Sequence, residues 1–139
     1  MLSRPGRRGN LLGSDLLQGF YLNDLFVEPL KGQVTGANWS RHLPPKAVEV
    51  LLCLARTPGE LVEKETLLDE AWGEGQGSQE ALSRAVGEIR NALGDQADRP
   101  VFIQTLPRRG YRLAVAPEPE PKHTDSIVIG ASGGSSDLG

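Results

Sequence analysis

The chain has 139 residues, of which 38% are hydrophobic and 24% charged, a balance typical of one soluble domain with short extensions. Its 15 Lys and Arg against 18 Asp and Glu give a net charge of −3, which argues against a general polyanion-binding protein but allows a local basic surface. The single cysteine, Cys53, excludes an intrachain disulfide and a multi-cysteine metal site. No apolar run reaches about 18 residues, so the sequence predicts no membrane span, and we expect a cytoplasmic protein.

The two ends of the chain differ in composition from its middle. Residues 1–18 contain Pro, Gly and Arg without a sustained hydrophobic period, so we expect a flexible N-terminal arm. Residues 117–139 begin with the Pro-rich run PEPEPKHTD and end in Gly and Ser, which predicts a linker or a disordered tail. One folded domain is therefore expected over residues 19–116.

Four short runs with the character of strands open this domain. They lie at residues 20–22, 25–28, 33–35 and 41–43. Turn-forming Asn, Asp, Pro and Gly separate the runs at the spacing of β-hairpins. The pattern predicts a small antiparallel sheet of three or four strands.

Helical segments follow the predicted sheet. The first begins at Pro44, since proline suits a first helical turn, and ends at Thr57 before a Pro-Gly pair. The second is expected from about Lys64 to Trp72, and the third from Gln79 to Leu93. A hairpin over residues 102–115 then closes the domain. Sheet, three helices and hairpin together predict an α+β fold.

The third predicted helix has two unlike faces. Its apolar face is expected in the core and consists of Leu82, Val86, Ile89 and Leu93. The opposite face and its flank carry Glu80, Ser83, Arg84, Gly87, Glu88, Arg90 and Asn91. Such a polar face is either a solvated surface or a helix that reads a DNA major groove. Taken alone, the helix does not decide between these two possibilities.

The hairpin tip favours the second possibility. Arg108 and Arg109 occupy the turn, where they are either ordinary exposed arginines or contacts to a phosphate backbone or a minor groove. From Glu80 to Arg112 there are six arginines and four acids, a local excess of +2 in an acidic chain. A helix and a hairpin that are adjacent in sequence are expected to touch one duplex together.

The domain resembles the OmpR/PhoB-type winged-helix DNA-binding domain, especially the CadC/ToxR-like branch of bacterial transcription regulators. The motifs that carry the resemblance appear in order at residues 25–29 (LFVEP), 43–55 (LPPKAVEVLLCLA), 58–73 (PGELVEKETLLDEAWG), 81–95 (ALSRAVGEIRNALGD) and 102–113 (FIQTLPRRGYRL). The resemblance implies a winged helix-turn-helix fold: an N-terminal antiparallel sheet, three helices and a C-terminal hairpin called the wing.

The resemblance also implies roles for particular residues. The third helix would read bases in the major groove through Ser83, Arg84, Gly87, Glu88 and Asn91. The DNA backbone and minor groove would be held by Trp72, Arg90 and the wing residues Arg108, Arg109 and Tyr111.

The resemblance further implies partners for the chain. The loop from Gly73 to Ser78 would contact RNA polymerase, and copies would associate head to tail on direct repeats in double-stranded DNA. Relatives continue into a membrane helix, so the chain is also compatible with the cytoplasmic part of a longer membrane-anchored regulator. No cofactor and no small-molecule ligand are expected.

Two other functions are less consistent with the sequence. A winged-helix module that binds a protein partner through the same exposed helix stays open, because the outward charges of that helix nearly cancel. An enzyme is disfavoured, since no nucleophile–base pair, carboxylate dyad or metal cluster can be assembled from these residues.

Overall fold

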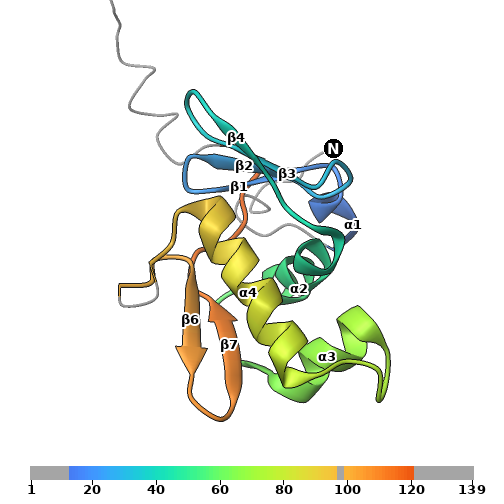
Figure 1. The fold of residues 1–139 in the computed structure, drawn as a ribbon. Coiled ribbons are helices and arrows are strands. Elements are labelled where there is room, and N and C mark those ends of the chain that lie inside the picture. The colour runs from blue at the N-terminus through green and yellow to red at the C-terminus, as the bar shows by residue number, and fades with distance from the viewer. Residues whose placement is uncertain (1–12, 97–98, 121–139) are drawn as a thin grey trace, which may run out of the picture.

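The computed structural model describes residues 13–96 and 99–120, and Figure 1 shows their order in space: a sheet, a group of helices and a hairpin. The elements are α1 (Gly13–Leu16), β1 (Phe20–Leu22), β2 (Leu25–Glu28), β3 (Gln33–Thr35), β4 (Ser40–His42), α2 (Pro45–Arg56), β5 (Val62–Glu63), α3 (Lys64–Trp72), α4 (Gln79–Leu93), β6 (Ile103–Leu106) and β7 (Gly110–Leu113). None of the helices in this described part of the chain has the length and apolarity needed to cross a membrane.

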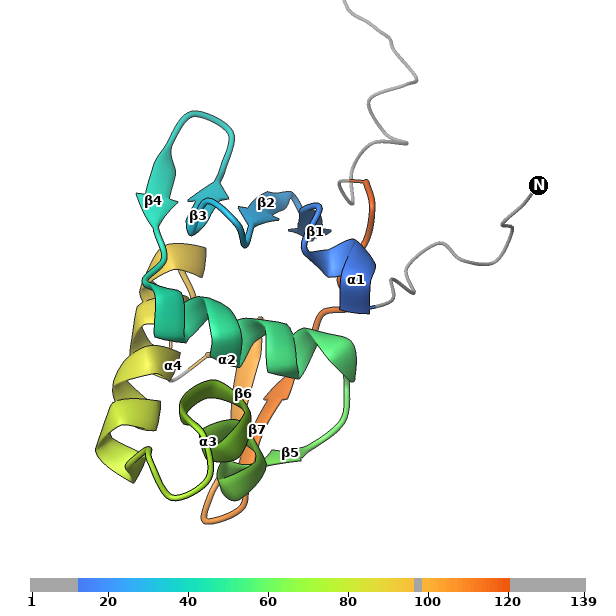
Figure 2. The same cartoon turned by 90° about the vertical axis from the view of Figure 1, so that its right-hand side faces the viewer.

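The N-terminal sheet is antiparallel, in the order β1-β2-β3-β4, as the sequence predicts. Phe20 pairs with Val27 and Val27 with Val34, so three buried side chains form a row across β1, β2 and β3. Directly paired residues of neighbouring strands point to the same face of the sheet, and here that face is turned toward the core. The sheet lies above α2, as Figure 2 shows, and the row joins the same hydrophobic core as the helices.

The helix α4 begins and ends where its sequence signals place it. The hydroxyl of Ser78 accepts a hydrogen bond from the backbone N–H of Ala81 at 3.1 Å, which satisfies one free donor of the first turn. Gly94 ends the helix in the left-handed conformation, at φ 73°, where a residue with a Cβ would be strained. The predicted range of this helix is confirmed.

A second, three-stranded sheet has the order β5-β7-β6 and includes the hairpin. Strand β5 has only two residues, which is too short to show an alternating pattern, so the sequence analysis missed it. Its close approach to β7 requires a glycine, because a Cβ on Gly110 would lie 2.0 Å from the carbonyl oxygen of Val62. The backbone N–H of Lys64 donates to the carbonyl of Arg109 at 3.0 Å and ties the hairpin to the start of α3.

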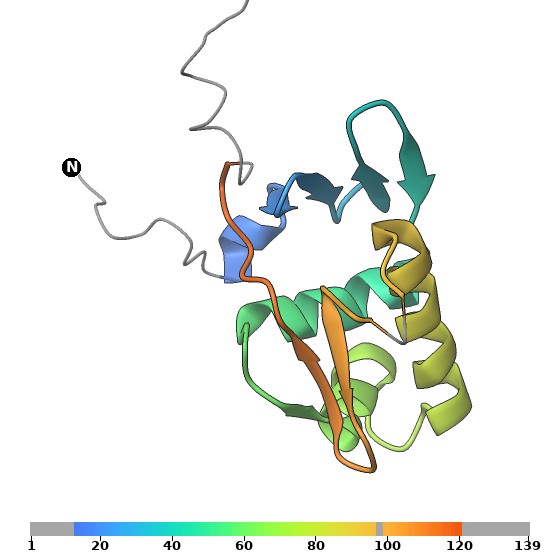
Figure 3. The same cartoon turned by 90° about the vertical axis from the view of Figure 1, so that its left-hand side faces the viewer.

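Residues on both sides of the expected range of 19–116 take part in the described fold. The short helix α1 places Leu16 in the core with no exposed surface, although a flexible arm was expected there. A single helical turn is too short to show a hydrophobic period. After β7 the chain returns to the N-terminal sheet, as Figure 3 shows. There the backbone groups of Glu118 and Tyr21 form two hydrogen bonds with each other, of 2.7 and 2.9 Å. The remainder of the expected arm and tail lies outside the described residues.

Two glycines give opposite expectations for a substitution by alanine. We expect Gly110→Ala to lower the free energy of unfolding by about 1–3 kcal/mol, because the new methyl group overpacks the β5–β7 contact. Gly87 lies in α4 with open space around its Cβ position, so Gly87→Ala should raise stability by about 1 kcal/mol through helix propensity. Urea unfolding of both variants measures the difference, and equal stabilities would contradict the close packing of β5 against β7.

Candidate nucleic-acid interface

The predicted base-reading residues share the outer face of α4. Ser83, Arg84 and Asn91 are exposed, and Gly87 and Glu88 are partly exposed. The opposite face is buried through Leu82, Ala85, Val86, Ile89, Ala92 and Leu93. Because these apolar residues fix the rotation of the helix, the polar residues are presented together to solvent.

The tip of the wing lies beside the first turn of α4. A surface groove is lined by Glu63, Lys64, Glu65, Gln79, Arg108 and Arg109, so the two wing arginines and the start of α4 border the same space. Both arginines are exposed, and Arg108 has a left-handed backbone, with φ 67°, that turns the hairpin tightly. Figure 2 shows the wing tip and the start of α4 at the same lower end of the molecule. Helix and wing can therefore face one ligand.

Arg90 joins α4 to the wing. Its Nη2 donates to the carbonyl oxygen of Ile103 and to the hydroxyl of Thr105, each at 2.9 Å. Both partners belong to β6, and the guanidinium is partly buried. Arg90 thus braces the angle between helix and hairpin, and its predicted contact with the DNA backbone stays a prediction.

Asp95 forms a second brace that the sequence analysis missed. Its carboxylate accepts hydrogen bonds from the backbone N–H groups of Val101, Phe102 and Ile103 at 2.6 to 3.2 Å. Charge-assisted bonds of this kind are stronger than neutral ones. They hold the chain that leads from α4 into β6. The signal in the sequence is weak, because an Asp after a helix-ending Gly is common in ordinary loops.

Two residues that are predicted to contact the DNA backbone are less exposed to solvent than the arginines at the wing tip. Tyr111 is only 7% exposed and packs in the core, so little of its surface is available to a ligand, and its role stays a prediction. Trp72 is half-buried at the end of α3, and the ammonium of Lys46 lies 5.7 Å from its ring centroid. Lys46, which the sequence analysis missed, lines a groove with Trp72, Glu80, Arg84 and Glu88 on the outer side of α4.

The loop from Gly73 to Ser78 is shaped by its glycines. Gly73 and Gly75 have φ of 100° and 75°, conformations that side chains with a Cβ rarely adopt. Glu74, Gly75 and Gln76 at its tip are exposed, so a partner can reach the loop. Nothing in its geometry selects RNA polymerase over another partner, and that contact stays a prediction.

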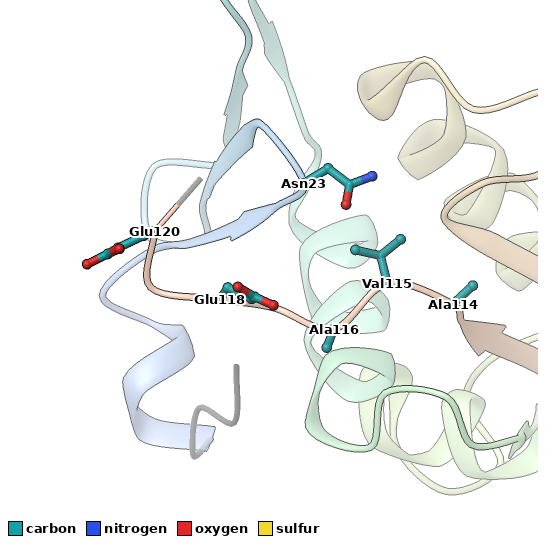
Figure 4. A pocket seen from close by; sticks show the side chains of 6 residues that line it. All are labelled: Asn23, Ala114, Val115, Ala116, Glu118 and Glu120. Atoms are coloured by element: carbon teal, nitrogen blue, oxygen red, sulfur yellow. The ribbon is translucent and has the colours of Figure 1, made fainter. Parts of the chain in front are cut away.

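A different hollow of the surface does not suit nucleic acid. It is lined by Asn23, Ala114, Val115, Ala116, Glu118 and Glu120, and Figure 4 shows Asn23 at the turn between β1 and β2 and the other five along the segment that follows β7. Its charged residues are both acidic, so it repels phosphate.

Within residues 13–96 and 99–120, no cluster of three or more His, Cys, Asp or Glu is placed to hold a metal ion. Burial in α2, together with the nearby Glu70 carboxylate, raises the pKa of the Cys53 thiol, as suits a packing residue.

The match to known families agrees with this geometry. Residues 39–113, which include α2, α3, α4 and the wing, match the family described as "Transcriptional regulatory protein, C terminal". The chain belongs to this family. Members are transcriptional regulators rather than enzymes, and the resemblance inferred from the sequence motifs is confirmed.

Curated relatives and solved structures support the same assignment. The chain is 32% identical over 115 residues to the transcriptional regulator HilA of Salmonella typhimurium, covering 78% of this chain and 21% of HilA. It is 28% identical to the transcriptional activator CadC of Escherichia coli, covering 68% and 19%. The chain thus spans about a fifth of the length of these relatives.

Among solved structures, the DNA-binding domain of Escherichia coli CadC aligns with a TM-score of 0.62 at 26% identity, covering 71% of this chain and 94% of that one. The response regulator DrrB of Thermotoga maritima, described as an OmpR/PhoB homologue, aligns with a TM-score of 0.59 at 33% identity, covering 69% and 44%. The predicted α+β winged helix-turn-helix fold is confirmed.

The brace at Asp95 generates a stability prediction. Asp95→Ala leaves three backbone N–H donors without their acceptor, so the free energy of unfolding should fall by about 1–3 kcal/mol in urea titrations. Glu74→Ala, which removes an exposed loop carboxylate, is the matched control and should stay within about 0.5 kcal/mol of wild type. If both variants unfolded at the same urea concentration as wild type, the brace would have no energetic importance.

Proposed function

We propose that the chain is the sequence-specific, double-stranded DNA-binding module of a bacterial transcription regulator. In this proposal α4 enters the major groove and the wing reaches the neighbouring minor groove. The observation that carries it is the groove shared by Gln79, Arg108 and Arg109, because it puts the start of α4 and the wing tip at one surface. Membership of the transcriptional regulatory family supports the same function.

The side chains on α4 suit base recognition. A B-DNA major groove admits one helix, and the fork of Arg84 matches the two acceptors of guanine. Glu88 can accept a hydrogen bond from the amino group of cytosine. Gly87 has open space beyond its Cα, which lets the helix backbone approach the base edges closely. Ser83 and Asn91 complete the base-reading face at its two ends.

The charge distribution predicts modest affinity for a single copy. Lys46 and Arg84 share their groove with Glu80 and Glu88, so that part of the surface is nearly neutral. The remaining positive charge lies mainly at the wing tip, and three or four phosphate contacts correspond to a salt slope of about −3. Head-to-tail binding of two copies to direct repeats would multiply this affinity, and a loop contact with RNA polymerase would add to it. We place this activity in the cytoplasm, where the duplex is accessible.

The wing is tested by removing its charges. The double variant Arg108→Ala, Arg109→Ala should weaken binding to all duplexes by a similar factor and make the salt slope shallower by about two, because two phosphate contacts are lost. Fluorescence anisotropy at several salt concentrations measures both effects. Wild-type affinity in this variant would refute the wing contact, and a wild-type chain that bound a protein but no duplex would favour the interaction-module alternative.

Base recognition is tested on α4 by a single arginine. Arg84→Ala should reduce discrimination at one or two base pairs by about 1–3 kcal/mol, with other positions unaffected. Selection from random duplexes before and after the substitution measures this change. Arg56→Ala is the control, since Arg56 is exposed at the end of α2 and pairs with Glu70 at 3.6 Å rather than facing the outer side of α4. A base preference unchanged by Arg84→Ala would remove Arg84 from the reading face.

A further inference from the structure

Arg41, which the sequence analysis did not single out, is held against the last turn of α4. It lies in β4, where all three side chains are exposed. Its guanidinium carbon is 4.2 Å from the centroid of the Trp39 ring, and its Nη1 donates to the carbonyl oxygen of Asn91 at 3.0 Å. The bond to Asn91 joins positions 50 residues apart in the sequence. They fix the cation beside the base-reading helix.

The position of Arg41 complements that of the wing. A surface groove beside α4 is lined by Arg41, His42, Pro44, Glu88, Asn91 and Ala92, so Arg41 borders two residues of the base-reading face. The wing arginines border the first turn of the same helix instead. A helix in a major groove has one phosphate strand on each side. The wing arginines lie at the first turn of α4 and Arg41 at its last turn, so each strand of phosphates would have a cation beside it.

We propose, resting on the DNA-binding function above, that Arg41 binds a backbone phosphate on the strand that borders the last turn of α4. A guanidinium has five N–H donors, and the Asn91 carbonyl occupies a donor of Nη1 only. Within residues 13–96 and 99–120, Arg41 forms no salt bridge. Stacking on Trp39 already limits the motion of the side chain, so little further entropy is lost when a phosphate is bound.

A purely structural role for Arg41 is the competing explanation. A cation near the C-terminus of a helix interacts favourably with its dipole, and Asn91 is in the last turn of α4. That role stabilises the fold but leaves the salt dependence of DNA binding unchanged. Phosphate binding instead releases a counterion, so it contributes about 0.9 to the salt slope. The two roles therefore differ in a measurable quantity.

The experiment uses the 139-residue chain, a duplex selected from a random pool by wild type, and an unrelated duplex of equal length. Arg41→Gln should lower affinity for both duplexes by about tenfold at low salt and make the slope shallower by about one. Arg41→Lys, which keeps the charge, should retain most of the slope. Arg56→Gln, at an exposed position that pairs with Glu70, should behave as wild type.

Thermal unfolding of the same variants separates the outcomes. A lowered melting temperature in Arg41→Gln with a wild-type salt slope would assign Arg41 a structural role and overturn the inference. If Arg108→Ala, Arg109→Ala reduced the slope and Arg41→Gln did not, the inference alone would fail and the proposed function would stand. If wild type bound neither duplex, the proposed function would fail together with the inference.

Discussion

The hydrogen bonds between the Asp95 carboxylate and the backbone of residues 101–103 determine how the functional surface is built. They set the point at which the chain leaves α4 and enters β6. Arg90 adds a second connection from the helix to β6, one turn earlier. Apart from these two side chains, the wing is held to α4 by the loop that connects the two elements and by apolar side chains such as Ile103 and Leu113 that join the same hydrophobic core as α4. The polar contacts limit reorientation of the wing relative to α4, which lowers the conformational entropy that binding a duplex would cost.

The same elements serve the core and the surface at once. Helix α4 buries one face against α2, which fixes the rotation of its polar face, and β7 buries Tyr111 and Leu113 while the turn before it stays exposed. The bond from Lys64 to the Arg109 carbonyl holds the far side of the wing to α3. The wing is therefore supported from two directions, by α4 through β6 and by α3 through β5. Such support keeps both elements in the geometry that recognition needs.

The sequence predicts the elements well and the contacts between them poorly. Helix α4 could be placed because Ser78, Gly94 and an apolar period all agree on its bounds. The β5 strand and the α1 helix were missed because they are too short for any period. The resemblance implies a DNA-backbone contact for Tyr111, whereas alternation in β7 turns this side chain inward with Leu113 and leaves Arg112 outward. Arg41 and Asp95 act through tertiary hydrogen bonds, which no local pattern encodes.

A net charge of −3 is compatible with DNA binding because the cations are concentrated where strands of phosphate would pass. The acidic Glu80 and Glu88 line a groove beside Arg84, and in the proposed function they would oppose general attraction to the duplex. Glu80 would weaken binding to every sequence alike, whereas the repulsion from Glu88 would be offset opposite a base that offers it an amino donor. Affinity for unrelated DNA would therefore fall more than affinity for the correct site. In the proposed function, a nearly neutral helix flanked by arginines would exchange binding strength for discrimination, and a second copy or a partner would supply the lost strength.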